Sequence, residues 1–255
     1  MIGDVVGKPG IQAVRKSLSK IVAEHRIDFV VANGENAAGG IGITPELAKE
    51  FFKMGIDCVT TGNHVWRQRE IQEYIARQPK LLRPDNFPTR QPGVGVGAYE
   101  TAGGVRVGVI NLAGRVFMDP ADNPFDVADR ALKTLDGVPI VLVDFHAEAT
   151  SEKKAMGLYL AGRVTAIVGT HTHVQTADES IFEGGTAFIT DMGMTGPHDS
   201  VIGMRKDLVL ERFVNGMPHA FRVAKQGVRF QGVVITADRD TGLASHIERL
   251  NLAVP

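Results

Sequence analysis

Two histidines, one residue apart, follow an apolar run in the second half of the chain. The segment is AIVGTHTHV, residues 166–174, and it is typical of a buried β-strand that delivers His171 and His173 into the turn at its end. Neutral imidazole is the commonest metal ligand in proteins, whereas an apolar core gains nothing from two such rings. The spacing therefore indicates metal binding.

Four other apolar runs also end in side chains that can bind a metal. Asp4 follows the first run, NGEN at 33–36 follows the second, GNH at 62–64 follows the third, and PIVLVDFH ends in His146. In open α/β sheets, ligands bind beyond the carboxyl ends of the strands. Five strand ends are therefore predicted to carry donors to one edge. The predicted metal ligands are Asp4, Glu35, Asn36, Asn63, His146, His171 and His173.

The types of donor restrict the metal. Oxygen and imidazole donors without thiolate suit Fe, Mn, Zn or Co, while Ca²⁺ and Mg²⁺ rarely take three histidines. Seven donors are too many for one catalytic ion, which must keep positions for water and substrate. We therefore predict two divalent transition-metal ions bridged by Glu35 and a hydroxide. Two divalent ions with the carboxylates of Asp4 and Glu35 leave a charge of about +2, which a hydroxide and a phosphodiester anion would neutralise. Paired ions of this kind hydrolyse phosphate esters by in-line displacement.

Strands and helices alternate through most of the chain. Helices are predicted from Pro9, from Thr44–Pro45 to Gly55, and near 67–77, 127–135 and after Thr150. Residues 94–112 predict a hairpin, and from about 185 the chain is mainly β with a short helix near 208–214. This order predicts an α/β sandwich with mixed sheets inside and helices outside. Because no linker interrupts it, we predict a single domain over residues 1–255.

Composition excludes several classes of function. A net charge of −1 provides no electrostatic footprint for duplex nucleic acid or an anionic membrane. No apolar run approaches the roughly 18 residues that span a bilayer, and no signal-peptide pattern precedes the first strand. The single cysteine, Cys58, forms no internal disulfide and fits a reducing cytoplasm. Only two residues precede the Gly3–Asp4 turn, which fits either an unusually short first strand or a start further upstream.

Several blocks of sequence resemble the calcineurin-like metallophosphoesterases. GNH and GTHTH match two motifs of that superfamily, whereas DVV lacks the histidine of D-x-H and NGEN has Glu35 in place of the aspartate of G-D-x-x-D. These departures, with GDVVGKPG, NGENAAGG, GRVFMDPADNPF, DFHAEATSEK and TDMGMTGPHDSVIG, resemble the YmdB-like branch. The resemblance covers nearly the whole chain and is weakest after about Lys206. It implies a metallophosphoesterase sandwich, two mixed β-sheets flanked by helices.

The resemblance also implies roles for the predicted ligands. One metal ion would be held by Asp4, Glu35, Asn36 and His173, with Asn36 replacing the missing D-x-H histidine. The other would be held by the bridging Glu35 together with Asn63, His146 and His171. His64 would be the general acid that protonates the leaving oxygen. Members of this branch are cytoplasmic phosphodiesterases with two iron-type metals (manganese or zinc also fit the donors), active on 2′,3′-cyclic nucleotides, and they form homo-oligomers, dimers or tetramers.

Other polar residues have simpler interpretations. Asn33 suits a turn, and Glu148 and Thr150 suit a helix start. Gly39, Gly40 and Gly42 could cradle a phosphate but fit a loop rim better. Arg115 and Phe117 could bind phosphate and stack on a base, or simply pack, and His198 could contact substrate or lie in a surface loop. His25, His219 and His246 follow no strand, so we assign them no chemistry.

Two alternative functions remain open at this point. A phosphomonoesterase, or a phosphodiesterase with other substrates, would use the same scaffold and metals. A regulatory protein could instead bind a nucleotide at the metal site without turnover. His64 argues against the regulator, since a pure sensor needs no general acid.

Overall fold

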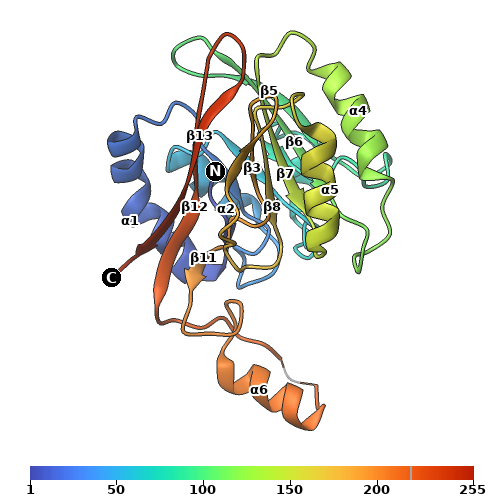
Figure 1. Ribbon diagram of the computed structural model, residues 1–255. Helices are drawn as coiled ribbons and strands as arrows, with labels where there is room; N and C mark the ends of the chain where they lie inside the picture. The colour runs from blue at the N-terminus through green and yellow to red at the C-terminus, as the bar shows by residue number, and fades with distance from the viewer. Residues whose placement is uncertain (219) are drawn as a thin grey trace.

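Two β-sheets lie between outer helices in the computed structural model, which describes residues 1–218 and 220–255 (Figure 1). His219 lies outside the described residues. The larger sheet has the order β5-β6-β7-β8-β10-β9. Its strands are β5 (Val96–Glu100), β6 (Arg106–Ala113), β7 (Ile140–His146), β8 (Ala166–Thr170), β10 (Thr186–Ile189) and β9 (Ser180–Phe182). Strands β6, β7, β8 and β10 are parallel, and β5 and β9 are antiparallel to their neighbours, so the sheet is mixed as predicted.

The second layer combines two smaller groups of strands. One is β2-β3-β4 and the other is β1-β11-β12-β13. Ile2 joins them, because it forms bridges to both Ala32 and Gly232. The strands of this layer are β1 (Asp4–Val5), β2 (Val31–Asn33), β3 (Cys58–Thr60), β4 (Leu81–Leu82), β11 (Met194–Pro197), β12 (Val228–Ala237) and β13 (Ala244–Ala253).

Helices cover both outer faces of the sheets. They are α1 (Gly7–His25), α2 (Pro45–Lys53), α3 (Ile71–Ile75), α4 (Pro124–Thr134), α5 (Thr150–Leu160) and α6 (Lys206–Asn215). Helix α1 buries Ile11, Val14 and Leu18 against the second layer, whereas α4 and α5 pack on the larger sheet. Helix α6 projects away from the body of the molecule, and Val209 is its only buried described residue (Figure 1).

A third apolar cluster fills the space between the sheets. It joins Val31 and Cys58 of the second layer to Val109, Leu142 and Val168 of the larger sheet. Cys58 is fully buried there, as the sequence predicted. With the two clusters under the helices, this core gives the αββα layering that the sequence predicted, and it fixes the strand ends relative to one another.

Two local predictions differ from the structure. The helix expected over 67–77 is shorter in the structure, where α3 spans only Ile71–Ile75. Its buried residues are Ile71 and Ile75, and the polar residues before it form turns instead of a further helical turn. Strands β4 and β9 were not predicted, because runs of two or three residues carry no periodicity. Among the described residues, no helix is long and apolar enough to cross a membrane.

Candidate metal centre

The seven predicted ligands lie at one edge of the two-layered fold, six of them at or just beyond strand ends. Two follow β2, one follows β3, one is the last residue of β7, and two follow β8. The seventh, Asp4, begins the very short strand β1 beside β11. The convergence that the sequence predicted is therefore present in the fold.

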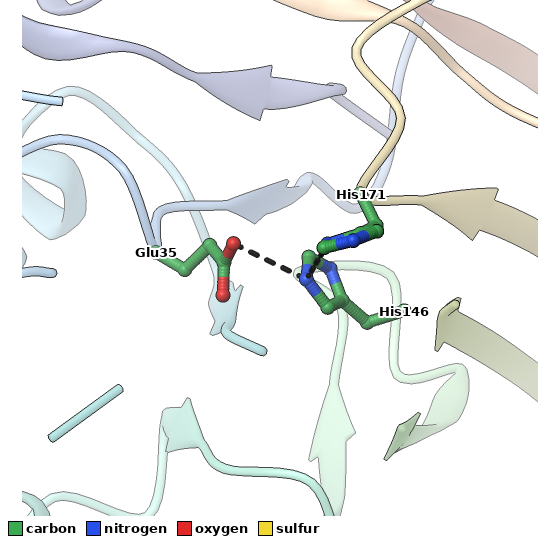
Figure 2. A group of neighbouring side chains, drawn as sticks. All are labelled: Glu35, His146 and His171. Carbon is green, nitrogen blue, oxygen red and sulfur yellow. Dashed lines mark hydrogen bonds and ion pairs between the residues drawn. The ribbon is translucent and has the colours of Figure 1, made fainter. Parts of the chain in front are cut away.

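Glu35, His146 and His171 form the tightest group of potential ligands (Figure 2). Their ligand atoms all lie within 4.8 Å of one another. His146 Nε2 is 3.1 Å from Glu35 Oε1 and 3.0 Å from His171 Nδ1. Asn63 adds a fourth atom, since its Oδ1 is 3.0 Å from His146 Nε2. One metal ion could be held at the point that these four residues face.

Asp4, Asn36 and His173 form a second group, which also contacts Glu35. Asn36 Nδ2 donates to Glu35 Oε1 at 3.1 Å and lies 3.1 Å from His173 Nε2. His173 Nε2 is 3.7 Å from Asp4 Oδ1, and the Asp4 carboxylate accepts from the backbone N–H of His171. Glu35 therefore contacts both groups, as a bridging ligand would.

The hydrogen bonds of the three histidines test whether this site fits a metal. One ring nitrogen of each faces an oxygen outside the cluster. His146 Nδ1 is 2.9 Å from Thr170 Oγ1, His171 Nε2 is 3.1 Å from Glu148 Oε2, and His173 Nδ1 is 2.9 Å from the Ile202 carbonyl. An N–H donated outward leaves the lone pair of the other nitrogen directed into the cluster, which is the usual arrangement of metal-binding histidines.

A carboxylate lies behind one of these bonds. Thr170 Oγ1 donates to Asp144 Oδ1 at 2.6 Å, so the same oxygen is left to accept from His146 Nδ1. Asp144 is fully buried and also accepts from Thr60 and Asn33. This chain of hydrogen bonds fixes both the tautomer and the ring orientation of His146. It also explains Asn33, which supports the site as well as the turn.

Two further observations fit a cation. Asp4 Oδ1 is buried and has no hydrogen-bond partner among the described residues, which is costly for a carboxylate unless a cation neutralises it. Gly62 lies so close to the site that a Cβ atom there would collide with the His146 ring and the Glu35 carboxylate. The residues present therefore fit a metal site with oxygen and imidazole ligands.

The electrostatics also favour positive charge. Burial opposes ionisation of Glu35, but the charge and hydrogen bonds of His146 and His64 outweigh it and hold the pKa of Glu35 well below its usual range. Burial lowers the pKa of His146, yet Glu35 and Asp4 raise it to about 9. Burial raises the pKa of Asp4 to about 6, whereas burial and the neighbouring His146 lower the pKa of His171 to about 3. The carboxylates thus draw positive charge to the centre of the cluster.

The turn after β8 is strained. His171 and His173 have φ angles of 98° and 64°, in the left-handed region that residues with a side chain rarely adopt. Such a residue costs roughly 1–3 kcal/mol and persists only where the surroundings enforce it. Here the strain places two imidazoles from one short turn against both halves of the site.

His64 lies at the more open side of the cluster. Its Nδ1 is 2.8 Å from Asn36 Oδ1 and 3.4 Å from Glu35 Oε1, and its backbone N–H donates to Glu35 Oε2. Its side chain is 26% exposed, whereas that of His146 is fully buried. His64 therefore contacts the predicted ligands and also reaches solvent.

Glu148 was missed as a site residue. The sequence suggested a helix start, but the residue precedes α5 and its carboxylate contacts His171. The signal available was its position two residues after His146. His198 contacts the backbone oxygen of Met194, and His25 and His246 pair with Glu248 away from the cluster.

The remaining loop residues have simple places in the structure. Gly40 has a φ of 98° and is buried against Met204 and Val223, whereas its neighbour Gly39 is exposed. The backbone N–H of Arg115 donates to Glu152. Phe117 is 89% exposed, which does not fit the alternative of ordinary packing.

The two facing sheets and the donors at their edge define a metallophosphoesterase-like fold. Residues 1–250 match the family described as YmdB-like protein. The chain belongs to that family.

Similar proteins cover almost the whole chain. The 2′,3′-cyclic-nucleotide 2′-phosphodiesterase of Bacillus subtilis (strain 168) is 46% identical over 250 residues, 98% of this chain and 94% of the relative. A hypothetical protein from Thermus thermophilus has a TM-score of 0.93 and 40% identity, covering 100% of this chain and 98% of that one. A novel phosphatase of Mycoplasma pneumoniae has a TM-score of 0.93 and 33% identity, covering 99% and 92%.

Proposed function

We propose that the chain is a dinuclear-metal phosphodiesterase that hydrolyses 2′,3′-cyclic nucleotides. The observation that carries the proposal is the approach of donors from both halves of the site to the buried carboxylate of Glu35. The name of the Bacillus subtilis relative supports the substrate class.

The residues that would hold the two ions form two groups around Glu35. One comprises Asp4, Glu35, Asn36 and His173, and the other comprises Glu35, Asn63, His146 and His171. Iron is the metal we favour, and manganese or zinc also fits the donors. When bound, the ions would supply positive charge for the phosphate and activate water as the nucleophile.

His64 would act as the general acid. Asn36 Oδ1 can accept from His64 Nδ1 at 2.8 Å with one lone pair, and its other lone pair would be the donor to the metal. This hydrogen bond orients the ring and leaves His64 Nε2 to give a proton to the departing ribose oxygen. The partial exposure of the ring is consistent with access to substrate. Such a proton matters because a ribose alkoxide is a poor leaving group.

A phosphomonoesterase is the second candidate, favoured by the description of the Mycoplasma pneumoniae structure as a phosphatase. The charge of the site distinguishes the two. About +2 from two ions and two carboxylates, less one hydroxide, matches a singly charged diester better than a doubly charged monoester. A nucleotide-binding regulator without turnover is the third candidate, and it leaves His64 without a role.

A turnover assay separates the candidates. Protein stripped of metal and reloaded with Mn²⁺ or Fe²⁺ is given 2′,3′-cyclic AMP, the two adenosine monophosphates, and an aryl phosphodiester with its matching monoester. We expect the diesters to be hydrolysed faster, and the cyclic nucleotide to yield the 3′-monophosphate if the 2′ ester breaks. Monoester turnover without diester turnover would favour the phosphatase. Tight nucleotide binding without any turnover would favour the regulator.

Assembly, location and domain organisation stay predictions. Family resemblance implies a homo-oligomer, a dimer or tetramer, in the cytoplasm, and the net charge of −1 predicts no partner of the nucleic-acid or membrane class. The shared core between the sheets supports one domain over residues 1–255. Sedimentation of the purified protein would measure the assembly.

A further inference from the structure

A lysine and an aspartate form a buried ion pair that the proposed reaction does not use. Lys153 of α5 is 1% exposed, and its Nζ lies 2.7 Å from Oδ2 of Asp191, which is fully buried. Burying two charges is costly, and replacing such a pair with apolar residues is often neutral or stabilising. Its presence therefore calls for a reason other than the stability of the fold alone.

Asp191 uses its other hydrogen bonds to hold one residue of the histidine turn. Its Oδ2 accepts from the backbone N–H of Thr172 at 3.2 Å and from Thr172 Oγ1 at 2.7 Å. Its Oδ1 accepts from the backbone N–H of Gly193 at 2.8 Å. Thr172 is thus held by both its backbone and its side chain.

Thr172 lies between the two strained histidines. His171 and His173 have left-handed backbone angles, and each belongs to a different half of the site. A turn with two such residues relaxes unless a neighbour holds it, and Asp191 makes the two side-chain hydrogen bonds to its central residue. Both histidines therefore flank the residue that this carboxylate holds.

Lys153 binds the same Oδ2 atom of that carboxylate that accepts from Thr172. A Cβ atom on Gly169, in the strand that leads to the turn, would lie 2.9 Å from Lys153 Cδ and would collide with the Thr190 carbonyl. The lysine stem thus packs closely against β8, while its ammonium neutralises Asp191. One side chain links α5, which follows His146, to the turn that carries the other two histidines.

We propose that Lys153 and Asp191 are positioning residues that hold the His171–His173 turn, through Thr172, in the conformation that binds both metals. The inference rests on the proposed function. It assigns the pair no contact with metal or substrate. Because the turn serves both halves of the site, loosening it weakens both metal sites together.

The test compares three variants as metal-free proteins, with K153R as a charge-conserving rescue of K153M. T172V removes only the hydroxyl donor, K153M removes the charge behind Asp191, and K154M changes the neighbouring exposed lysine as a matched control. Mn²⁺ binding is measured by calorimetric titration, thermal unfolding is recorded without metal, and kcat and KM are measured on the reloaded proteins.

We expect T172V and K153M to fold and to bind Mn²⁺ about 10–100-fold more weakly at both sites, as loss of groups behind metal ligands typically does. Their kcat should fall while KM changes little, and K153R should restore part of the affinity. K154M should bind like the wild type. If K153M does not fold, T172V decides alone.

Two results would overturn different claims. Lower thermal stability in T172V and K153M with wild-type Mn²⁺ affinity would make the pair merely structural and refute this inference. Failure of the wild-type protein itself to bind two Mn²⁺ ions would refute the proposed dinuclear site instead.

Discussion

His146 and Asp4 are both fully buried at the same edge of the fold, yet their polar atoms differ in hydrogen-bond partners. His146 donates to Thr170, which is backed by Asp144, and its other nitrogen faces Glu35, Asn63 and His171. Asp4 keeps one carboxylate oxygen without a hydrogen-bond partner among the described residues. The protein completes the surroundings of His146 by itself, whereas those of Asp4 are complete only with a cation.

This difference predicts an order of binding. The His146 half has its ligands preoriented by buried hydrogen bonds, so an ion binding there orders few groups. The Asp4 half keeps a buried carboxylate oxygen, 3.7 Å from His173 Nε2, that no hydrogen bond from the described residues preorients. We therefore expect the first equivalent of metal to bind at the His146 half. Substitutions at Glu35, His64, Thr170 and Asp4 test this difference.

Glu35→Gln should have the largest effect, because Glu35 contacts both halves. The substitution removes the only carboxylate within 3.1 Å of His146 Nε2 in the described structure, and it removes the bridge. We expect Mn²⁺ affinity at both sites to fall by more than about 100-fold, beyond the usual loss from a residue behind a ligand. Elemental analysis should find well under two ions per chain. Loss of one ion with the other intact would contradict a bridging role.

His64→Ala should leave the contrast intact and remove the chemistry. Both ions should remain, and kcat for the cyclic nucleotide should fall on the order of 10²–10⁴-fold. The loss should shrink for a diester with an acidic phenol leaving group, which departs without a proton. Equal losses on both substrates, or loss of a metal ion, would show that His64 is structural or a ligand.

The sequence predicted the strand ends and their polar residues because apolar runs identify buried strands. GNH and GTHTH each follow such a run, so their place at one edge follows from the parallel order of the strands. The contacts of Thr170 with Asp144 and of Thr172 with Asp191 could not be predicted. They join residues that are distant in sequence, and a threonine in a strand or turn carries no signal of its own.

The sequence also could not predict the backbone strain of the histidine turn or the position of Glu148. Histidine is compatible with many backbone conformations, so nothing in GTHTH indicates the left-handed angles of His171 and His173. Glu148 resembles an ordinary residue before a helix, and only the packing of the loop brings it to His171. The first strand also differs from the expectation, since Asp4, predicted to lie in the turn after it, begins β1.

Thr170→Val should weaken metal binding in the His146 half alone. Valine keeps the shape but leaves His146 Nδ1 and one Asp144 oxygen unpaired in a buried place, at a cost of about 1–3 kcal/mol in the free energy of unfolding. Mn²⁺ affinity should fall about 10–100-fold in one binding step, with the other step unchanged.

Thr186→Val is the control for this variant. Thr186, the first residue of β10, is buried in the same sheet and donates to the Val164 carbonyl. It should lose stability without losing metal affinity. Equal weakening of both binding steps in Thr170→Val would refute the separate character of the two halves.

Asp4→Asn should have the smallest effect on the metal-free protein, and its sign is informative. Asparagine keeps an oxygen that can accept from the His171 N–H, removes the buried charge, and can donate its amide toward His173. The metal-free variant should therefore be more stable than the metal-free wild type by about 1 kcal/mol or more, since an unsatisfied buried acceptor is lost. For a chain of this size that is a rise of about 2–4 °C in Tm.

With Mn²⁺ in excess the order should reverse, because ligand binding stabilises the wild type by about 2.7 kcal/mol at 100 times Kd and the variant lacks one ligand charge. A metal-free variant that unfolds at a lower temperature than the wild type would mean that Asp4 supports the fold by itself. The contrast between the two halves would then be lost.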